Sequence, residues 1–264
     1  MSELALNDMT IPGETVIDAI RNAGYDGVQV GGEMTPEEKA HCQRVGLRIA
    51  GSSRINRPED AEDAALRLSD SGCVCGTLHV GWGMEEDAEA RSLIEAVMCA
   101  SQKHRVPLYI ETHRASVFQD PWRTVGFIRD YPGLRLNGDF SHWYTGQEMV
   151  YGGFENKLRF VAPVLERVRF LDGRIGNPGC IQVDIGDGRI DGQPYVAHFR
   201  RLWTESMRGF LQSAQPGDFM IFSPELLASC IYYAQSEDSD RWQQSLVLCR
   251  IARECFEEAS RPLD

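Results

Sequence analysis

Short apolar runs alternate along the chain with longer segments in which apolar residues recur at helical spacing. The runs predict strands at residues 27–30, 47–50, 73–80, 106–111, 134–139, 168–172 and 219–222, and a further short strand at 4–6. The segments between them predict helices at about 13–23, from 35 onward, and at 58–70, 85–103, 121–129, 157–166, 195–213 and 239–258. This alternation is typical of a parallel sheet covered by helices.

Eight strand–helix repeats in a chain of 264 residues match a (β/α)8 TIM barrel. No Pro- or Ser-rich linker divides the chain, so we expect a single α/β domain over residues 1–264. A doubly wound open sheet is the alternative. Segment 173–193 is rich in Gly and Asp and lacks helical periodicity, which predicts a long irregular loop, either functional or a disordered surface loop.

Charge and composition narrow the class of partner. The net charge of -12 argues against nucleic acid and favours a small-molecule substrate or a metal ion. No apolar stretch is long enough to cross a bilayer, and the first residues lack the pattern of an export signal. The eight cysteines form no Cys-x-x-Cys pair, which indicates reduced packing residues. We therefore expect a cytoplasmic protein with no membrane partner. Its oligomeric state stays open, although barrels of this kind often form homo-oligomers.

Four acidic residues fall at the ends of predicted strands: Glu111, Asp139, Asp172 and Glu225. The carboxyl ends of barrel strands open into one bowl, so these carboxylates would repel one another and take up protons unless a cation compensated them. A divalent ion held by all four is the simplest compensation. The alternative is that these acids cap helices or pair with arginines on the rim.

Three histidines and one arginine accompany these acids and are candidate substrate-binding residues. His113 and His142 each follow a strand-end carboxylate within three residues, and His79 ends an apolar run. A lone histidine such as His79 is as often structural. Arg174 lies two residues beyond Asp172, where it either holds that carboxylate or presents its guanidinium to a substrate oxygen or phosphate. The sequence contains neither a Walker-type phosphate loop nor a serine nucleophile elbow.

The order and spacing of these motifs resemble a known superfamily. The motifs are Glu111-Thr112-His113-Arg114, Asp139-Phe140-Ser141-His142-Trp143, Asp172-Gly173-Arg174-Ile175-Gly176 with Gln182-Val183, and Pro224-Glu225. They resemble the xylose-isomerase-like TIM barrels, in particular the sugar phosphate isomerases/epimerases, over about residues 106–233.

The resemblance implies a divalent metal held by a Glu, an Asp, a His and a Glu from four strands. Glu111, Asp139 and Glu225 match three of these ligands, and Asp172 stands where the family has the histidine. An all-oxygen set of this kind favours Mn or Mg. The resemblance also makes the two glutamates the acid and base, and gives His142 and Arg174 the role of holding substrate oxygens.

We therefore expect a metal-dependent isomerase or epimerase of carbohydrate metabolism that moves a proton alpha to the carbonyl of a small polyhydroxylated substrate. This step needs a base and an electrophile that stabilises the enediolate, and a metal ion supplies the second. Two alternatives stay open: a dehydratase or other lyase that uses the same intermediate, and a metal-free binding protein with a degenerate site, which Asp172 favours. An abasic-site endonuclease fits poorly because the chain is acidic and has few candidate histidines. Trp143, Tyr144 and Trp203 either stack on a substrate or belong to the core.

Overall fold

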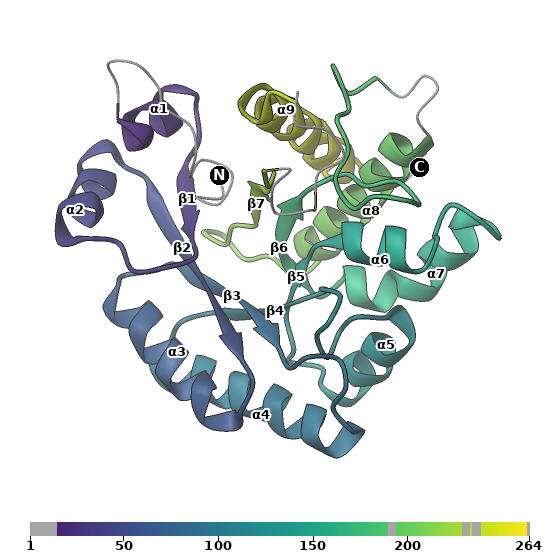
Figure 1. Cartoon of the computed structure of the whole chain (residues 1–264), viewed down its shortest axis with the longest axis horizontal. Helices are drawn as coiled ribbons and strands as arrows, with labels where there is room; N and C mark the ends of the chain where they lie inside the picture. The colour runs from purple at the N-terminus through teal and green to yellow at the C-terminus, as the bar shows by residue number, and fades with distance from the viewer. Residues whose placement is uncertain (1–14, 190–193, 229–232, 234–238, 263–264) are drawn as a thin grey trace.

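Seven parallel strands form a sheet that nearly closes into a barrel in the computed structural model, which describes residues 15–189, 194–228, 233 and 239–262 (Figure 1). Neighbouring strands pair in chain order from first to last. Their bounds are Gly27–Val30 (β1), Arg48–Ile55 (β2), Cys75–Val80 (β3), Leu108–Glu111 (β4), Leu136–Gly138 (β5), Val168–Gly173 (β6) and Ile221–Pro224 (β7). The predicted TIM-barrel fold is confirmed, whereas the strand predicted at 4–6 lies outside the described residues.

Helices surround these strands on the outside, as Figure 1 shows. Within the described ranges they are Val16–Asn22 (α1), Pro36–Val45 (α2), Pro58–Asp70 (α3), Asp87–His104 (α4), Pro121–Asp130 (α5), Phe140–Gly146 (α6), Phe154–Leu165 (α7), Pro194–Leu211 (α8) and Arg241–Ala259 (α9). The sequence pattern did not predict α6, because its residues are nearly all buried and the pattern shows no polar face. None of the helices in these ranges is long and apolar enough to cross a bilayer.

Local capping explains why several helices begin where the sequence predicts. The Thr35 side chain accepts a hydrogen bond from the backbone N–H of Glu38 at 3.2 Å, and the Glu38 carboxylate accepts one from the Thr35 N–H at 2.8 Å. Pro36 occupies the first turn of α2, where its missing N–H costs no hydrogen bond. This reciprocal capping box fixes the start of α2.

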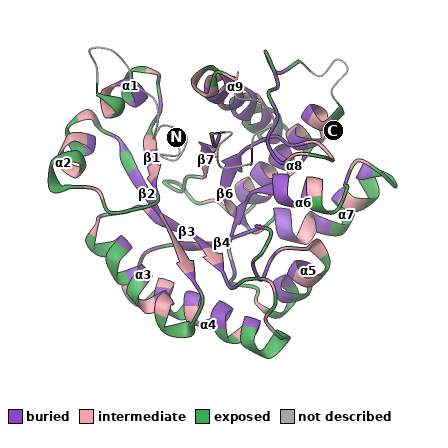
Figure 2. Cartoon of the chain, in the orientation of Figure 1, coloured by how far each residue is buried: buried purple, intermediate pink, exposed green. Residues whose placement is uncertain are grey.

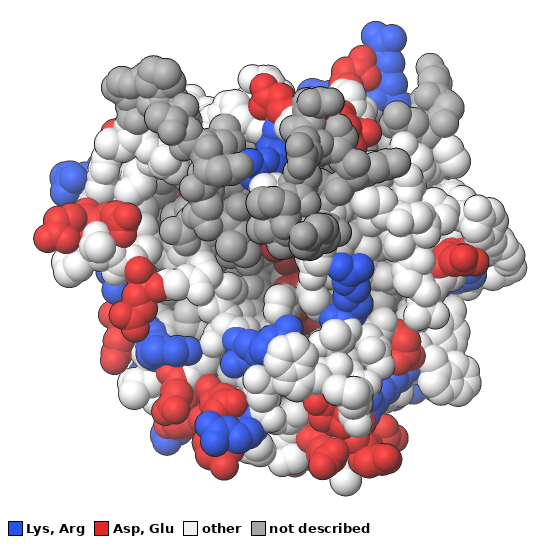
Figure 3. Space-filling view, viewed as in Figure 1, with Lys and Arg blue, Asp and Glu red and all other residues white. Residues whose placement is uncertain are grey.

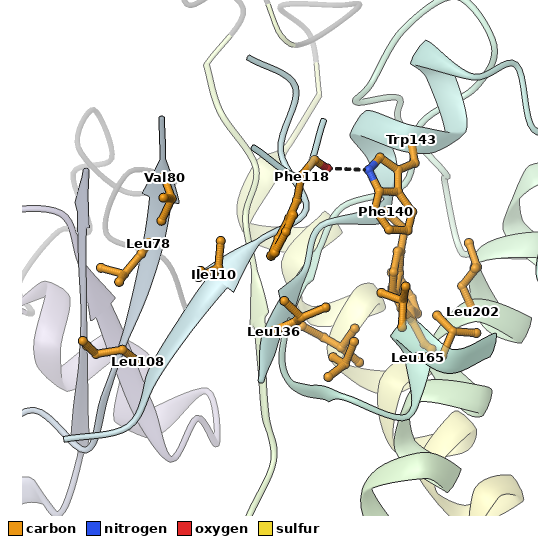
Figure 4. Close-up of a cluster of buried hydrophobic side chains, with 14 of the residues drawn as sticks. Leu78, Val80, Leu108, Ile110, Phe118, Leu136, Phe140, Trp143, Leu165 and Leu202 are labelled. Atoms are coloured by element: carbon orange, nitrogen blue, oxygen red, sulfur yellow. Dashed lines mark hydrogen bonds between the residues drawn. The ribbon is translucent and has the colours of Figure 1, made fainter. Parts of the chain in front are cut away.

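Apolar side chains fill the space between the strands and the surrounding helices. Figure 2 shows burial along the strands and on the helix faces turned toward them. Figure 4 shows side chains from both layers in one cluster, including Leu78, Ile110, Leu136, Phe140 and Leu202. The fully buried indole of Trp143 donates a hydrogen bond to the Phe118 carbonyl oxygen at 2.9 Å. Trp143, Tyr144 and Trp203 all belong to this core rather than to a substrate platform.

Inside the barrel, an apolar layer lies nearer the amino ends of the strands and a polar layer lies nearer their carboxyl ends. The apolar layer contains Ala50, Cys75, Tyr109, Phe170 and Ile221.

The polar layer links the first and last described strands through side chains. Ser223 Oγ on β7 donates to Gln29 Oε1 on β1 at 2.9 Å, and Gln29 Nε2 donates to Thr77 Oγ1 on β3 at 3.0 Å. These bonds connect β7 to β1, for which no backbone ladder is found in the described part of the sheet.

An irregularity between β5 and β6 decides which β6 residues face the interior. Leu136 pairs with Val168, but the next residue, Asn137, pairs with Phe170, so Arg169 is passed over. Such a bulge shifts the inward–outward alternation of a strand by one residue. As a result Phe170 lies in the interior layer while Val168 packs in the outer core.

We expect Phe170→Ala to lower the free energy of unfolding by about 3–5 kcal/mol, because it empties the centre of the barrel. Urea denaturation of the two proteins measures the difference. Phe256→Ala on α9 is the matched control, since that ring is 40% exposed, and we expect it to cost about 1 kcal/mol or less. A loss below about 1 kcal/mol for Phe170→Ala would contradict the central packing role.

Candidate functional site

The four predicted acidic residues lie together at the carboxyl ends of four neighbouring strands. Glu111 ends β4, Asp139 follows β5, Asp172 lies near the end of β6, and Glu225 follows β7. Burial raises the pKa of Asp172 well above its usual value, and the nearby charges of Glu225, Glu111 and Asp139 raise it further. Figure 3 shows a central recess with acidic atoms at its bottom and basic atoms at its edge. The predicted convergence on one bowl is therefore observed.

Asp139 both caps a helix and forms a buried ion pair. Its Oδ1 accepts hydrogen bonds from the Ser141 backbone N–H at 3.0 Å and the Ser141 hydroxyl at 2.6 Å, which fixes the start of α6. Its Oδ2 pairs with Arg174. Burial alone would raise the pKa of Asp139, but Arg174 and His142 hold it below its usual range. Both parts of the alternative interpretation of these acids, capping and pairing with arginine, thus apply to Asp139.

Arg174 supplies a fixed positive charge to this bowl. Its Nη2 contacts Asp139, lies 3.1 Å from Glu225 Oε2 and 3.3 Å from His142 Nε2, while Nε donates to Ser141 Oγ at 3.1 Å. Burial opposes its charge, but Asp139 and Glu225 raise the pKa of the guanidinium. Arg174 therefore forms its ion pairs with these two carboxylates and not with Asp172. Its Nη1 is buried and has no partner among the described residues.

The three predicted histidines form a row of rings beside Glu111. The His79 and His113 ring centroids are 4.1 Å apart, and those of His113 and His142 are 3.9 Å apart. His79 Nε2 lies 3.1 Å from Glu111 Oε2. Burial would raise the pKa of Glu111, but His79 and His113 lower it to about 2. Burial lowers the pKa of His113 to about 3, so this ring is neutral near pH 7.

Asp172 and Glu225 differ from the other two acids because their pKa values rise. Asp172 Oδ2 accepts a hydrogen bond from Asn137 Nδ2 at 2.5 Å, whereas its buried Oδ1 has no partner among the described residues. Burial raises the pKa of Glu225 to about 7, although Arg174 opposes this shift. Burial is the largest cause of both shifts, and the neighbouring carboxylates raise both pKa values further.

Two compact groups of side chains in the described residues could hold a metal ion. In each group the ligand atoms lie within 4.8 Å of one another; one contains His79, Glu111 and His113, and the other Glu111, Asp139 and His142. Only two of the four predicted ligands, Glu111 and Asp139, belong to these groups, so the four-carboxylate ligand set stays a prediction.

The residues of this bowl nevertheless fit a divalent cation. The Oδ1 of Asp172 is buried and has no partner among the described residues, and carboxylate with imidazole is a common donor set for such ions.

Three side chains of the site were not predicted. Asn137 donates to Glu111 Oε2 at 3.3 Å as well as to Asp172, and Ser141 connects Asp139 with Arg174. Asn137 could have been found because it lies two residues before Asp139, on the same side of the predicted strand.

Arg54 is the third, and no motif in the sequence points to it. It donates to the Gly81 carbonyl oxygen at 2.8 Å and lies 3.3 Å from His79 Nδ1. It was missed because the predicted second strand ended at residue 50, whereas β2 extends to Ile55.

A cavity of about 290 Å³ adjoins the bowl. It is lined by Arg114, Gln119, Asp120, His142, Thr145, Gly146, Gln147 and Ile181. The Arg114 guanidinium lies 4.5 Å from the centre of the Tyr233 ring.

The predicted irregular loop packs beside this cavity. Within its described part, residues 173–189, Ile181 lines the cavity, and Gln182 exchanges two hydrogen bonds of 2.8 Å with the backbone of Leu227, beyond β7. The described part of the loop is therefore packed against the site.

Comparison with known proteins shows the fold. No protein-family model matches the sequence, and no curated protein matches it either. The structure is similar to that of the probable 3-DHS dehydratase AsbF from Bacillus anthracis, with a TM-score of 0.57 and 13% identity over 95% of this chain and 96% of that one. It is also similar to a protein from Sinorhizobium meliloti 1021, with a TM-score of 0.54 and 14% identity over 93% and 92% of the two chains.

A third similar structure is a xylose isomerase-like TIM barrel protein from Mycobacterium smegmatis in complex with magnesium. Its TM-score is 0.53, with 14% identity over 92% of this chain and 86% of that one. The resemblance inferred from the motifs is thus confirmed at the level of the fold.

We expect Arg174→Met to lower the free energy of unfolding by about 3–5 kcal/mol, because Asp139 would lose the cation beside its buried charge and Glu225 would lose its ion pair. Urea denaturation measures the loss. Arg159→Met is the control, since that exposed side chain bonds only to Asn156, and we expect a change of about 0.5 kcal/mol or less. Equal losses for the two variants would rule out this electrostatic role.

We expect Mn²⁺ or Mg²⁺ to raise the melting temperature, and to raise it more at about pH 8 than at about pH 5.5. The pKa of Glu225 is raised to about 7, so this carboxylate adds its negative charge to the bowl at the higher pH, and protons compete with the metal at the lower one. Glu111→Gln should remove most of the shift, whereas Glu148→Gln on the exposed loop after α6 should retain it. A shift independent of pH, or no shift, would count against a metal in this bowl.

Proposed function

From the premise that this chain has the xylose-isomerase-like TIM-barrel fold, we propose that it is an enzyme that moves a proton alpha to the carbonyl of a small polyhydroxylated substrate, as an isomerase or epimerase does. One observation carries the proposal: two strand-end glutamates lie in the same bowl with opposite pKa shifts, to about 2 for Glu111 and to about 7 for Glu225. Acid–base enzymes separate the pKa values of neighbouring carboxyl groups in this way, so that one exchanges protons near neutral pH while the other stays ionised.

Glu225 is the residue to which we assign proton transfer. Its side chain is 16% exposed, and Arg174 holds one of its oxygens at 3.1 Å, so its position is fixed while the other oxygen can face a substrate. When ionised it accepts the proton from the substrate carbon, and when protonated it returns that proton to the enediolate. Glu111 stays ionised across the neutral range because of its lowered pKa, which suits a ligand better than a proton carrier.

Glu111, Asp139 and His142 would hold a divalent cation, for which Mg²⁺ and Mn²⁺ are suitable. When bound, this ion supplies polarisation of the carbonyl group and stabilisation of the enediolate charge. The magnesium complex of the similar Mycobacterium smegmatis protein supports this assignment.

The unpartnered donors of the bowl would bind the oxygens of the substrate. Arg174 Nη1 and His142 Nδ1 are both buried and lack partners among the described residues. Arg114 lines the adjoining cavity of about 290 Å³ and can bind a further oxygen. A recessed site of this size suits a small molecule, so we propose a small polyhydroxylated compound as the partner, with neither nucleic acid nor membrane involved.

A dehydratase is the second candidate, favoured by the similarity to the probable 3-DHS dehydratase. Glu225 would again remove the alpha proton, and the intermediate would then lose its beta hydroxyl as water. Mass analysis of the product separates the two reactions, because isomerisation leaves the mass unchanged.

A metal-independent binding site is the third candidate. The observation that favours it is the position of Arg174 Nη2, which contacts Asp139, Glu225 and His142 at once. The melting experiment with Mn²⁺ and Mg²⁺ addresses this candidate.

The proposed proton transfer is tested by incubating the protein with Mn²⁺ and a panel of ketoses, aldoses and cyclic hydroxyketones in D₂O. We expect NMR to show deuterium exchange at the carbon beside the carbonyl of at least one compound. Exchange should increase with pH through about 7, because Glu225 must be ionised to act as the base. Absence of exchange with every compound would count against proton abstraction.

Glu225→Gln should lower the exchange rate by about 100- to 10,000-fold, since the amide cannot accept the proton. Glu148→Gln, on the exposed loop after α6, is the matched control and should leave the rate unchanged. Full activity of Glu225→Gln with an unchanged melting temperature would refute the assigned role.

A further inference from the structure

A second cavity, of about 560 Å³, lies at the opposite end of the barrel from the candidate site. Its walls come from the amino ends of the strands, including Leu108 at the start of β4, Arg135 just before β5, Arg169 near the start of β6 and Phe219 just before β7. The interior layer that contains Phe170 lies between this cavity and the bowl of carboxylates. The two cavities are therefore separate sites.

Positive charge without a carboxylate partner gathers at this second cavity. Arg135 donates only to the carbonyl oxygens of Pro132 at 3.0 Å and Leu134 at 2.9 Å, through the single atom Nη1. Its Nε and Nη2 make no hydrogen bond with the described residues. Burial and the neighbouring Arg167 lower the pKa of Arg135, as expected for a guanidinium with no anion beside it.

Arg169 adds a second guanidinium group that forms no ion pair among the described residues, although the charge of Asp218 acts to raise its pKa. It donates to the carbonyl oxygens of Glu166 at 3.0 Å and Val168 at 2.7 Å and to Ser213 Oγ at 2.8 Å, all of them neutral acceptors. Burial and Arg135 lower its pKa. Arg169 is the residue that the β5–β6 pairing passes over, so the bulge that orders the barrel interior also places this arginine at the cavity.

The remaining walls are largely apolar. Met98, Leu134 and Phe210 line the cavity, together with Phe219, whose ring is 42% exposed. Asp218 is the only acid among the described lining residues, and it is exposed and accepts a hydrogen bond from the Gln215 backbone N–H at 2.8 Å. Two arginines against one acid leave the cavity positive in a chain whose net charge is -12.

We propose that this cavity binds a small organic anion: a carboxylate or phosphate group joined to an apolar or aromatic body. The two guanidinium groups offer the paired N–H donors that such oxyanions accept. The aromatic and aliphatic walls would cover the body of the ligand. The site does not depend on the proposed function, because it shares no residue with the bowl at the carboxyl ends of the strands.

The first test is isothermal titration calorimetry with phenyl phosphate and phenylacetate as probes. We expect at least one of them to bind, with a Kd on the order of 1 mM or lower, and the comparison decides between a phosphate and a carboxylate. Inorganic phosphate, which lacks the apolar body, should bind at least about tenfold more weakly than phenyl phosphate. No heat of binding from either probe up to about 10 mM would overturn the proposal.

The second test locates the binding. The double variant Arg135→Gln/Arg169→Gln should bind the better probe at least about tenfold more weakly, because it removes both charges. Arg159→Gln, far along the exposed face of α7, is the matched control and should leave binding unchanged. Glu225→Gln should also leave it unchanged, which separates this site from the proposed active site. Equal affinity of the double variant and the parent protein, at unchanged melting temperatures, would place the binding elsewhere and refute the assignment.

Discussion

Arg174 and the carboxylates around it set the main electrostatic constraint on this structure. Four acidic side chains meet at the carboxyl ends of neighbouring strands, and the guanidinium of Arg174 neutralises Asp139 and Glu225 there. Removing a charge from water is costly unless an opposite charge replaces the lost hydration. Asp172 receives no such partner, and its pKa rises accordingly. The chemistry proposed for the bowl depends on this uneven compensation, because it requires one carboxylate that stays ionised and one that exchanges protons near neutral pH.

The barrel makes this arrangement possible by separating an apolar interior from a charged mouth. Phe170 and its apolar neighbours fill the centre of the barrel. The hydrogen bonds of Gln29 lie on the side toward the carboxyl ends of the strands, and the charged residues lie beyond them at those ends. The bulge passing over Arg169 aligns Asn137 with Phe170, so that Asn137 can bond Asp172 above it. The same bulge puts an unpaired arginine at the other end of the barrel. One local irregularity thus influences the electrostatics of both ends.

The two ends of the barrel differ in the sign of their charge: carboxylates are in excess at the carboxyl end, and arginines at the amino end. At the carboxyl end, Arg174 is the one buried arginine among the described residues, and four carboxylates lie around it, which suits a cation. The amino end has arginines bonded only to neutral oxygens, which suits an anion. Because an apolar layer lies between them, the two proposed ligands would have no direct contact with each other. Any coupling between the ends would have to pass through the packing of the strands themselves.

The sequence by itself determined the barrel and the identity of its strand-end acids. Strand and helix periodicities are local properties of the chain, and strand ends in a parallel barrel always face one side, so Glu111, Asp139, Asp172 and Glu225 could be placed together before any coordinates were known. Only the tertiary structure decided which of these carboxylates forms an ion pair with Arg174. Arg174 pairs with Asp139, which lies 35 residues earlier in the chain, because strand register and a bulge bring those atoms into contact. Such partners depend on distances between separate strands, and no local pattern of residues specifies them.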